Sequence, residues 1–443
     1  MKSDGPATDV VIVGGGFSGT MAAAELARRG VKSLLVEGGG RAGRGTAYST
    51  REPAHLLNVP AAKMSAWADA PDDFVAQGHA PGEFVQRLQF GAYLGRILDG
   101  AAASGHAEVA EACAVKAERH GENWLVTLDD GRAVEAAALV LAQGNQPPEP
   151  MAVGAGISPE RFVNNPWRDE AAAAVVRVAD ADGEKGVGDV LILGTGLTMV
   201  DMVLSLDEAG HRGGIVALSR RGQIPRAHAT FEPAPTELEE VPLGNVLALW
   251  RWLRRRSAAV GWRAAVDALR PHSHAIWRSF DDQEQRRFLR HARPWWDVHR
   301  HRIAPQVAQR LRAMVAEGRL EIVAGRVRAM REGLVGVTVE YQRRERPSSA
   351  RQRDFAVAFN CTGPLGRMAQ TRDPLLRQMV DDGLVAINRL GMGIEVDAGS
   401  RAAPGVWALG PLAKGALWEI VAVPDIRGQV AGVADDISKE LRS

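Results

Sequence analysis

Apolar residues in this chain fall into short runs, each followed by a glycine-rich turn and a segment with helical spacing. Val10–Val13 is wholly apolar, and Ser18–Arg29 is rich in Ala and Leu before it ends at Gly30. Ser33–Val36 is mostly apolar again. Runs of this length are typical of strands buried on both faces of a parallel sheet, so the chain begins with a predicted strand–helix–strand unit.

The same pattern returns 180 positions later. Asp189–Leu193 is predicted to be a buried strand, a helix follows as far as Gly210, and Ile215–Leu218 is the next predicted strand. Two such units, so far apart, indicate an α/β protein with two similar domains.

The pattern between these units is less regular. Phe84–Leu98 has helical spacing, and the runs Trp124–Leu128 and Val134–Leu141 flank an Asp-Asp-Gly turn, which predicts a hairpin-like pair of strands. Pro150 to about Gly188 is a connector with little signal.

The last third of the chain returns to strands. Leu334–Tyr341 and Phe355–Phe359 are predicted strands on either side of a polar turn, Arg343–Arg353. Gly405–Pro411 is a strand that ends in Gly-Pro, and Asp425–Leu441 is predicted to be the final helix.

Residues 250–312 differ in composition from the rest. They hold 15 arginines and 5 acidic residues, a net charge of +10, and six of the eleven tryptophans, with apolar positions at helical spacing. Arg interleaved with Trp can bind nucleic acid, but no nucleic-acid motif is present, so we expect a helical insertion whose arginines lie on solvated faces or pair with acidic residues elsewhere. His291, His299 and His301 lack a metal-ligand spacing, so we expect no metal.

The overall composition is that of an ordinary globular protein. The 443 residues are 46% hydrophobic and carry a net charge of +1, which gives no general attraction to nucleic acid or membrane. We expect no signal peptide and no membrane span. Cys113 and Cys361 are the only cysteines and form no Cys-x-x-Cys motif, which favours a reducing cytoplasm and excludes an internal redox dithiol.

The first glycine turn has the chemistry of a dinucleotide site. Gly14, Gly16 and Gly19 have G-x-G-x-x-G spacing: the first permits the tight turn, the second lets a pyrophosphate approach, and the third lets helix and strand pack closely. The helix N-terminus then presents free N–H groups to the phosphates. Glu37 ends the second strand, where a carboxylate can accept hydrogen bonds from ribose hydroxyls.

The second turn departs from the first in two ways. Gly194 and Gly196 repeat the first two glycines, but Met199 stands at the third position, so we expect looser packing between helix and strand. Ser219–Arg221 replaces the ribose carboxylate. A carboxylate would repel a 2′-phosphate and arginines would bind it, so the sequence favours NADPH over NADH.

Further short motifs are spread over nearly the whole chain, at Gly45–Tyr48, His55–Pro60, Met64–Ser65, Gly194–Asp201, Ser219–Gly222, Asp297–His301, Asn360–Pro364 and Trp418–Pro424. With the glycine turns, they make the sequence similar to the flavoproteins with two dinucleotide-binding domains, which include group B flavin monooxygenases and pyridine-nucleotide reductases. Within these, it resembles the bacterial family called FAD/NAD(P)-binding protein.

The resemblance implies an α/β fold of two nested Rossmann-like domains. The FAD domain would be discontinuous, at 1–165 and 354–443. The NAD(P)H domain would lie between them, at 166–353, with the Arg/Trp-rich helical insertion at about 245–312.

The resemblance also assigns roles to single residues. Gly144 and Gly363 would be the crossover glycines between domains, and Gly410 would approach the flavin's ribityl-phosphate chain. Many relatives carry aspartate after that glycine, whereas this chain has Pro411. Asn58 would lie over the flavin ring as an amide donor and is the one catalytic candidate. The complete expected cofactor set is Gly14, Gly15, Gly16, Phe17, Ser18, Gly19, Glu37, Thr46, Asn58, Met64, Val115, Gly144, Gly194, Gly196, Leu197, Thr198, Ser219, Arg220, Arg221, Gly363, Gly410, Pro411 and Trp418.

Three functions are compatible with these expectations, all using FAD and, in the first two, NADPH. The favoured one is a monooxygenase whose reduced flavin forms a C4a-(hydro)peroxide and oxygenates a small molecule, such as an amine at nitrogen. The second is a reductase that passes electrons to a separate acceptor, and the third is a flavin-bound sensor without turnover. Phe162–Trp167 lacks the Gly and His found at this place in many group B monooxygenases, which weighs against Baeyer–Villiger chemistry.

Overall fold

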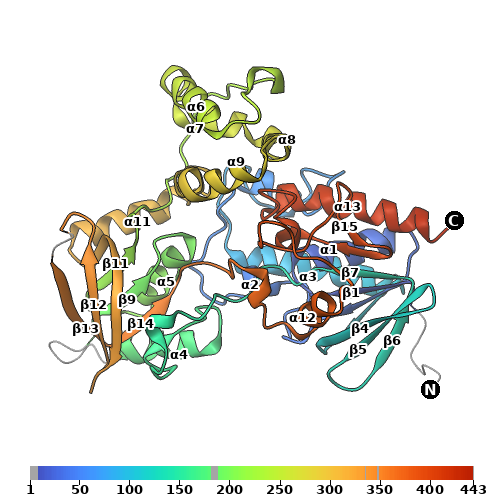
Figure 1. The fold of residues 1–443 in the computed structure, drawn as a ribbon, viewed down its shortest axis with the longest axis horizontal. Helices are drawn as coiled ribbons and strands as arrows, with labels where there is room; N and C mark the ends of the chain where they lie inside the picture. Colours follow the sequence, from blue (N-terminus) through green and yellow to red (C-terminus); the bar gives the residue numbers. More distant parts are fainter. Residues whose placement is uncertain (1–7, 181–187, 335, 347–348, 443) are drawn as a thin grey trace.

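The computed structural model of the chain describes residues 8–180, 188–334, 336–346 and 349–442. Two α/β bodies lie side by side, and a group of helices projects above the junction between them (Figure 1). One hydrophobic cluster surrounds the first sheet, two lie on the opposite faces of the second, and a fourth lies among the projecting helices. The expected α/β architecture is confirmed.

The first sheet has the order β15-β16-β7-β1-β2-β3 and is parallel except for the β15–β16 pair. Its strands are β1 (Val10–Val13), β2 (Ser33–Val36), β3 (Ala107–Ala110), β7 (Ala138–Leu141), β15 (Arg401–Ala403) and β16 (Val406–Ala408). β1, β2 and β7 are buried along their whole length, as their apolar runs predict. Since β16 pairs with β7, two segments far apart in the sequence build this sheet.

Three long helices accompany the first sheet. These are α1 (Phe17–Arg28), α3 (Arg87–Ala103) and α13 (Val423–Glu440). Helix α1 contacts both α3 and α13 and lies between them. The short helices α2 (Gly45–Tyr48) and α12 (Pro374–Asp381) belong to the same body.

The second sheet has the order β13-β12-β11-β10-β9-β14-β8. Its strands are β8 (Phe162–Val163), β9 (Val190–Leu193), β10 (Ile215–Ser219), β11 (Leu320–Glu332), β12 (Val337–Arg343), β13 (Ala350–Phe355) and β14 (Val357–Asn360). Helices α4 (Asp169–Asp180), α5 (Leu197–Glu208) and α11 (Pro305–Ala316) cover one face. Strands β8 and β14 belong to this sheet, so it includes residues 162–163 and 357–360. The domain boundaries expected at 165/166 and 353/354 stay a prediction.

A small antiparallel sheet of β4 (Ala114–His120), β5 (Asn123–Leu128) and β6 (Ala133–Ala136) corrects the predicted hairpin. The second arm, Val134–Leu141, is two strands, because β6 pairs with β5 whereas β7 pairs with β1 and β16. Burial alternates along β6 and is complete along β7. A strand with one buried face therefore runs directly into a strand with two.

The segment from about 245 is helical, as expected. It comprises α6 (Val246–Val260), α7 (Trp262–Ala268), α8 (Ser273–Ser279), α9 (Asp282–Arg287), a π-helical turn at Phe288–Ala292, and α10 (Arg293–Arg300). Helix α11, which lies partly within the expected limit of 312, packs on the second sheet. Within the described residues, no helix has both the length and the apolar character needed to cross a membrane, and no cluster of His, Cys, Asp and Glu could hold a metal ion.

Other expectations need correction. The helix expected at Phe84–Leu98 is α3, Arg87–Ala103, because Gln86 is extended and pairs with Leu56 in an isolated β-bridge, so the helix begins only after it. The connector from Pro150 contains β8 and α4, and its residues 181–187 lie outside the described part of the chain. The polar turn Arg343–Arg353 includes most of the edge strand β13, whose exposed polar residues hid the strand pattern.

Candidate functional site

The first glycine turn uses its glycines in two different ways. Gly14 has φ +105°, and a Cβ there would lie 2.6 Å from the carbonyl oxygen of Ala142. A Cβ at Gly19 would overlap the carbonyl oxygen of Gly14. At Gly16, by contrast, the nearest atom to such a Cβ is 3.8 Å away. Gly14 and Gly19 are therefore needed for folding, whereas Gly16 leaves space above the turn.

The start of α1 and the end of β2 lie beside this turn and present the groups that a dinucleotide needs. Gly16 caps α1 without a side-chain hydrogen bond, so the first-turn N–H groups stay available. The carboxylate of Glu37 accepts hydrogen bonds from the N–H of Gly15 at 2.7 Å and of Gly39 at 2.9 Å. Glu37 is thus fixed at the end of β2, beside the turn.

A groove of about 920 Å³ opens directly over the turn. It is bounded by the turn, the end of β2, α2, residues 142–148 and 165–170, residues 360–364 and the start of α13. The expected residues that line it are Gly14, Gly16, Phe17, Ser18, Glu37, Thr46, Gly144, Thr198, Gly363 and Pro411. Residues from both parts of the predicted FAD domain therefore meet in one groove.

The second turn repeats the geometry of the first. Gly194 has φ +110°, and a Cβ there would overlap the carbonyl group of Cys361. A Cβ at Gly196 would meet no atom within 4 Å. Gly196 also caps α5 without a side-chain bond. Met199 occupies the position equivalent to Gly19 of the first turn, and its side chain is fully buried there, whereas at Gly19 there is no room for a side chain. Helix α5 is therefore less closely packed at this point than α1.

The residues after β10 form a separate arginine pocket. Ser219 shares a hydrogen bond of 2.8 Å with the hydroxyl of Thr195 and accepts one from the N–H of Gly222, so it supports the turn from within. Arg221 lines a pocket of about 240 Å³, whereas Arg220 is exposed and does not line it. The other lining residues are Gly222, Gln223, Ile224, Arg226, Trp295 and Arg344. No acidic residue lines this pocket, so its charge suits an anion.

Comparison with known proteins agrees with this geometry. Residues 11–146 match a family model described as FAD-NAD(P)-binding. This protein has an FAD-NAD(P)-binding domain. No curated protein sequence matches the chain.

Solved structures extend the likeness to both bodies. An ornithine N-hydroxylase from Kutzneria sp. 744 is 15% identical, with 99% of this chain and 100% of that chain covered and a TM-score of 0.65. An L-lysine 6-monooxygenase from Pseudomonas syringae is 16% identical over 98% and 99%, with a TM-score of 0.63. A bacillithiol disulfide reductase from Staphylococcus aureus is 14% identical over 98% and 99%, with a TM-score of 0.60. The fold is that of the flavoproteins with two dinucleotide-binding domains, which confirms the resemblance.

The groove of the FAD-NAD(P)-binding domain fits the cofactor that the family description names. A dinucleotide needs free N–H groups, an open approach at the second glycine and a carboxylate at the end of the second strand. Gly16, Glu37 and the start of α1 supply these within one groove. When bound, FAD exchanges hydride and electrons with its reaction partners.

Several expected flavin contacts do not line the groove. The carbonyl oxygen of Asn58 accepts a 2.9 Å hydrogen bond from Nε2 of His228, so its backbone ties the 55–64 segment to the second body. Met64 is 3% exposed in the core of the first body, and Val115 lies on β4. Gly410 is pressed against Ser18, since a Cβ there would lie 2.8 Å from the hydroxyl oxygen. Gly15 and Gly19 also do not line it, and neither do Gly194, Gly196 and Leu197, which were expected to hold NAD(P)H on the second turn.

Trp418 belongs instead to the helical insertion's core, where its ring stacks on Trp277 at 5.0 Å. Nε1 of Trp277 donates to the carbonyl oxygen of Gly415 at 2.9 Å, and Nε1 of Trp296 donates to Glu419 at 2.7 Å. The insertion therefore holds the segment between Pro411 and Val421, both of which line the groove.

Glu419 is the charged centre of this contact. Burial alone would raise the pKa of its carboxyl group, but His301, Arg300 and Trp296 outweigh burial and lower the pKa to about 2. Nε of Arg300 lies 3.2 Å from the carboxylate. Glu419 also has φ +73°, a backbone conformation that residues other than glycine rarely adopt, so packing and these partners hold it in place.

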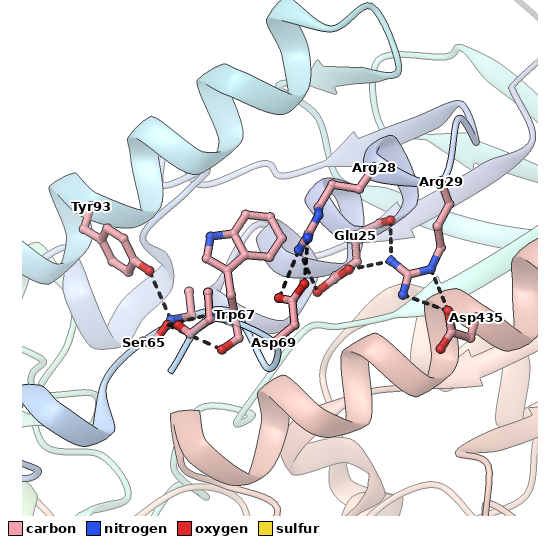
Figure 2. A network of polar contacts seen from close by, with 10 residues as sticks. Glu25, Arg28, Arg29, Ser65, Trp67, Asp69, Tyr93 and Asp435 are labelled. Atoms are coloured by element: carbon pink, nitrogen blue, oxygen red, sulfur yellow. Dashed lines mark hydrogen bonds and ion pairs between the residues drawn. The ribbon is translucent and has the colours of Figure 1, made fainter. Parts of the chain in front are cut away.

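The loop that follows α2 is fixed from several sides. Figure 2 shows Tyr93 of α3 and Arg28 of α1 reaching the 65–69 segment. The hydroxyl of Tyr93 accepts from the N–H of Ala66 at 3.1 Å, and Arg28 bonds Asp69 while it lies 4.6 Å from the ring of Trp67. Burial raises the pKa of Tyr93, so its hydroxyl stays neutral.

Sequence reasoning missed several residues that line the groove. Tyr48 and Asn360 lie inside the motifs Gly45–Tyr48 and Asn360–Pro364, which carried the resemblance but predicted no role for these two residues. Trp167 and Arg168 lie in the connector that showed little signal. Arg87 gave no signal, because its partner Asp201 is 114 positions away.

Proposed function

We propose that this protein is an FAD-dependent, NADPH-using monooxygenase that oxygenates a small molecule at an amine nitrogen. The observation that carries the proposal is the contact between the helical insertion and the C-terminal wall of the groove. This contact runs through Trp277, Trp296 and Trp418. It joins the helical insertion to the 411–421 segment that borders the groove. Reduced flavin in such a site can transfer oxygen rather than release peroxide, provided that water is kept away.

Aromatic side chains of the insertion pack against the segment that forms this wall. Phe280, Phe288 and the stacked Trp277–Trp418 pair form one aromatic cluster. The segment that leaves this cluster continues through Val421 and Val423, which line the groove. The groove's polar lining includes the first glycine turn and Glu37, where a phosphate and a ribose would sit, and further polar residues on other sides, such as Arg44, Gln143 and Asn165.

The structural neighbours support the nitrogen as target. The Kutzneria ornithine N-hydroxylase and the lysine 6-monooxygenase both share the arrangement of the two bodies over nearly their whole length. Their names describe enzymes that act on amino acids. We therefore propose a small amine as the substrate class.

A reductase that passes electrons to a separate acceptor is the second candidate. The likeness to a bacillithiol disulfide reductase favours it. An internal dithiol is excluded, because Cys361 is buried, with a pKa raised by burial, and Cys113 is exposed in a different body. Any disulfide substrate would have to react with the flavin directly.

The two candidates differ in what happens to oxygen. We would supply the purified protein with FAD, NADPH and oxygen, add small primary amines one at a time, and measure hydroxylated product and hydrogen peroxide per NADPH consumed. A monooxygenase should yield close to one product per NADPH with its amine. NADPH oxidation that yields only peroxide with every amine, but speeds up with a disulfide, would instead establish the reductase. Absence of NADPH oxidation under all conditions would leave only the sensor.

A further inference from the structure

A second large cavity lies outside the flavin groove. It has a volume of about 630 Å³, within the range of roughly 300–1,000 Å³ that is usual for small-molecule sites, and it shares no lining residue with the groove. Its walls come from the loop after β10 and from α7, α10, α11 and β11. Its lining is mainly apolar and includes Met199, Ile224, Leu311, Val315, Leu320 and Ile322.

Three arginines also line this cavity, and no acidic residue does. Arg226, Arg263 and Arg312 form no ion pair among the residues that the structure describes. The nearby Arg302, by contrast, pairs with Asp267. An apolar chamber with three uncompensated cations is therefore complementary to a molecule with an apolar body and a negative charge.

One of these arginines, Arg263, has a guanidinium that is held in position in advance. Nη2 of Arg263 donates to the carbonyl oxygen of Ala227 at 2.9 Å, and its guanidinium lies 4.3 Å from the ring of Trp262. Nε of Arg263 is buried and, within the described residues, has no hydrogen-bond partner. The backbone of Arg226 is bonded on both sides, to Val298 at 2.9 Å and to Ile303 at 3.0 Å. A ligand would therefore meet one guanidinium that is already ordered, that of Arg263.

His299 reports the local potential from inside the cavity lining. Burial lowers the pKa of its imidazole, and the charges of Arg226, Arg302 and Arg263 lower it further. Its Nδ1 is bonded to the carbonyl oxygen of Trp295 at 2.7 Å. Positive charge therefore dominates around a neutral imidazole at this wall.

We propose that this cavity binds an apolar carboxylate, with its hydrocarbon part among Ile224, Leu311 and Val315 and its carboxylate at Arg263 and Arg312. Charge-assisted hydrogen bonds from guanidinium groups are the strong contacts that a carboxylate makes in proteins. Arg226 also lines the arginine pocket after β10, whereas Arg263 and Arg312 line only this cavity. None of its residues lines the flavin groove, whereas Ile224 and Arg226 also line the arginine pocket after β10.

The test is calorimetric titration of the full-length protein with decanoate, and with decanol as the uncharged probe of equal length. Arg312→Gln and Arg263→Gln should each weaken decanoate binding about tenfold, since each removes one charge-assisted contact. Val315→Trp should abolish binding by filling the cavity, and Val315 is 46% exposed, so the change leaves the core intact. Arg254→Gln, at an exposed position on α6 outside the cavity, is the matched control and should bind decanoate as the parent does.

Three results would overturn the proposal. Decanoate that fails to bind, or that binds no more tightly than decanol, would remove the role of the arginines. Unchanged decanoate affinity in Arg312→Gln, Arg263→Gln and Val315→Trp would place the ligand elsewhere. Stoichiometric displacement of decanoate by NADP⁺ would assign the cavity to the nucleotide. Retention of FAD absorbance and of the thermal unfolding midpoint shows that each variant is folded.

Discussion

Arg87 and Asp201 join the two bodies through a buried ion pair with two parallel hydrogen bonds, each 2.9 Å long. Arg87 begins α3 and lines the flavin groove, and Asp201 lies on α5, just behind the second glycine turn. Their side chains are only 10% and 8% exposed. His55 adds a contact of its Nε2 with the backbone oxygen of Asp201 at 3.0 Å. This network fixes the start of α5 relative to the groove.

Removal of one partner should therefore be costly. We expect Arg87→Met to lower the free energy of unfolding by about 3–5 kcal/mol, because it leaves the Asp201 carboxylate buried without its partner. Chemical denaturation measures this change. The double variant Arg87→Met/Asp201→Leu is the control and should recover most of the loss, since no buried charge is then left. A single variant as stable as the parent would show that the pair does not join the bodies.

The two open glycines allow a matched pair of substitutions. A Cβ at Gly16 or Gly196 meets no protein atom closer than 3.8 Å, so valine at either position should leave the fold intact. Gly16→Val should give a colourless protein, because the side chain blocks the pyrophosphate. Gly196→Val should stay yellow but lose reduction by NADPH. Absorbance at the flavin bands and anaerobic titration with NADPH measure the two effects.

Each of these variants is the control for the other. Both should show the unfolding midpoint of the parent protein, since neither position is packed. The assignment of FAD to the first turn would be wrong if Gly16→Val retained flavin at full occupancy. An equal loss of flavin in both variants would likewise contradict separate sites.

Nucleotide choice should depend on the arginines after β10. We expect Arg220→Ala/Arg221→Ala to raise the KM for NADPH roughly tenfold to a hundredfold, because one lost charge-assisted contact is worth about 1.5–3 kcal/mol. The KM for NADH should hardly change. Steady-state reduction of the flavin with both nucleotides measures the difference. Arg344→Ala should act in the same direction, since Arg344 and Arg221 line one pocket, and an equal effect on both nucleotides would place these arginines elsewhere.

Stability in mild acid should depend on His228. Burial lowers the pKa of its imidazole to about 4, so between pH 6.5 and 4 the unfolded chain binds a proton that the folded protein does not. Stability is therefore unaffected above pH 6.5 and falls as the pH drops toward 4, by up to about 3 kcal/mol from this group. Unfolding measured at pH 7.5 and at pH 4.5 should show a smaller fall for His228→Gln than for the parent. Identical falls would mean that His228 does not stay neutral in the fold.

Local pattern was enough to predict the central parts of both domains. Val10–Val13 and Val190–Leu193 are apolar throughout because neighbours cover both faces, and glycines are required where backbones touch, as at Gly14 and Gly194. Local pattern failed where partners are distant in sequence. The edge strand β13 is polar because it lies exposed at the end of the sheet, and only its pairing with β12 defines it.

The site was predictable to the same extent. Gly16 and Glu37 follow from the spacing of one strand–helix–strand unit. Trp418 was expected beside the flavin, but its ring packs on Trp277, and nothing local to either residue predicts that contact. Arg344 meets Arg221 only because β12 returns beside β11, so this side of the arginine pocket could not be derived from the sequence, whereas Arg226 lies only five positions after Arg221.

The central claim is that this site directs reduced flavin to transfer oxygen, and rapid mixing tests it most directly. The protein is reduced anaerobically with NADPH and is then mixed with oxygenated buffer, with and without the amine panel. Absorbance is followed over the range in which flavins absorb, roughly 350 to 500 nm. We predict a transient that absorbs between the reduced and oxidised bands and that decays faster with the correct amine. Direct reoxidation in one step, without a transient for any amine, would contradict the account.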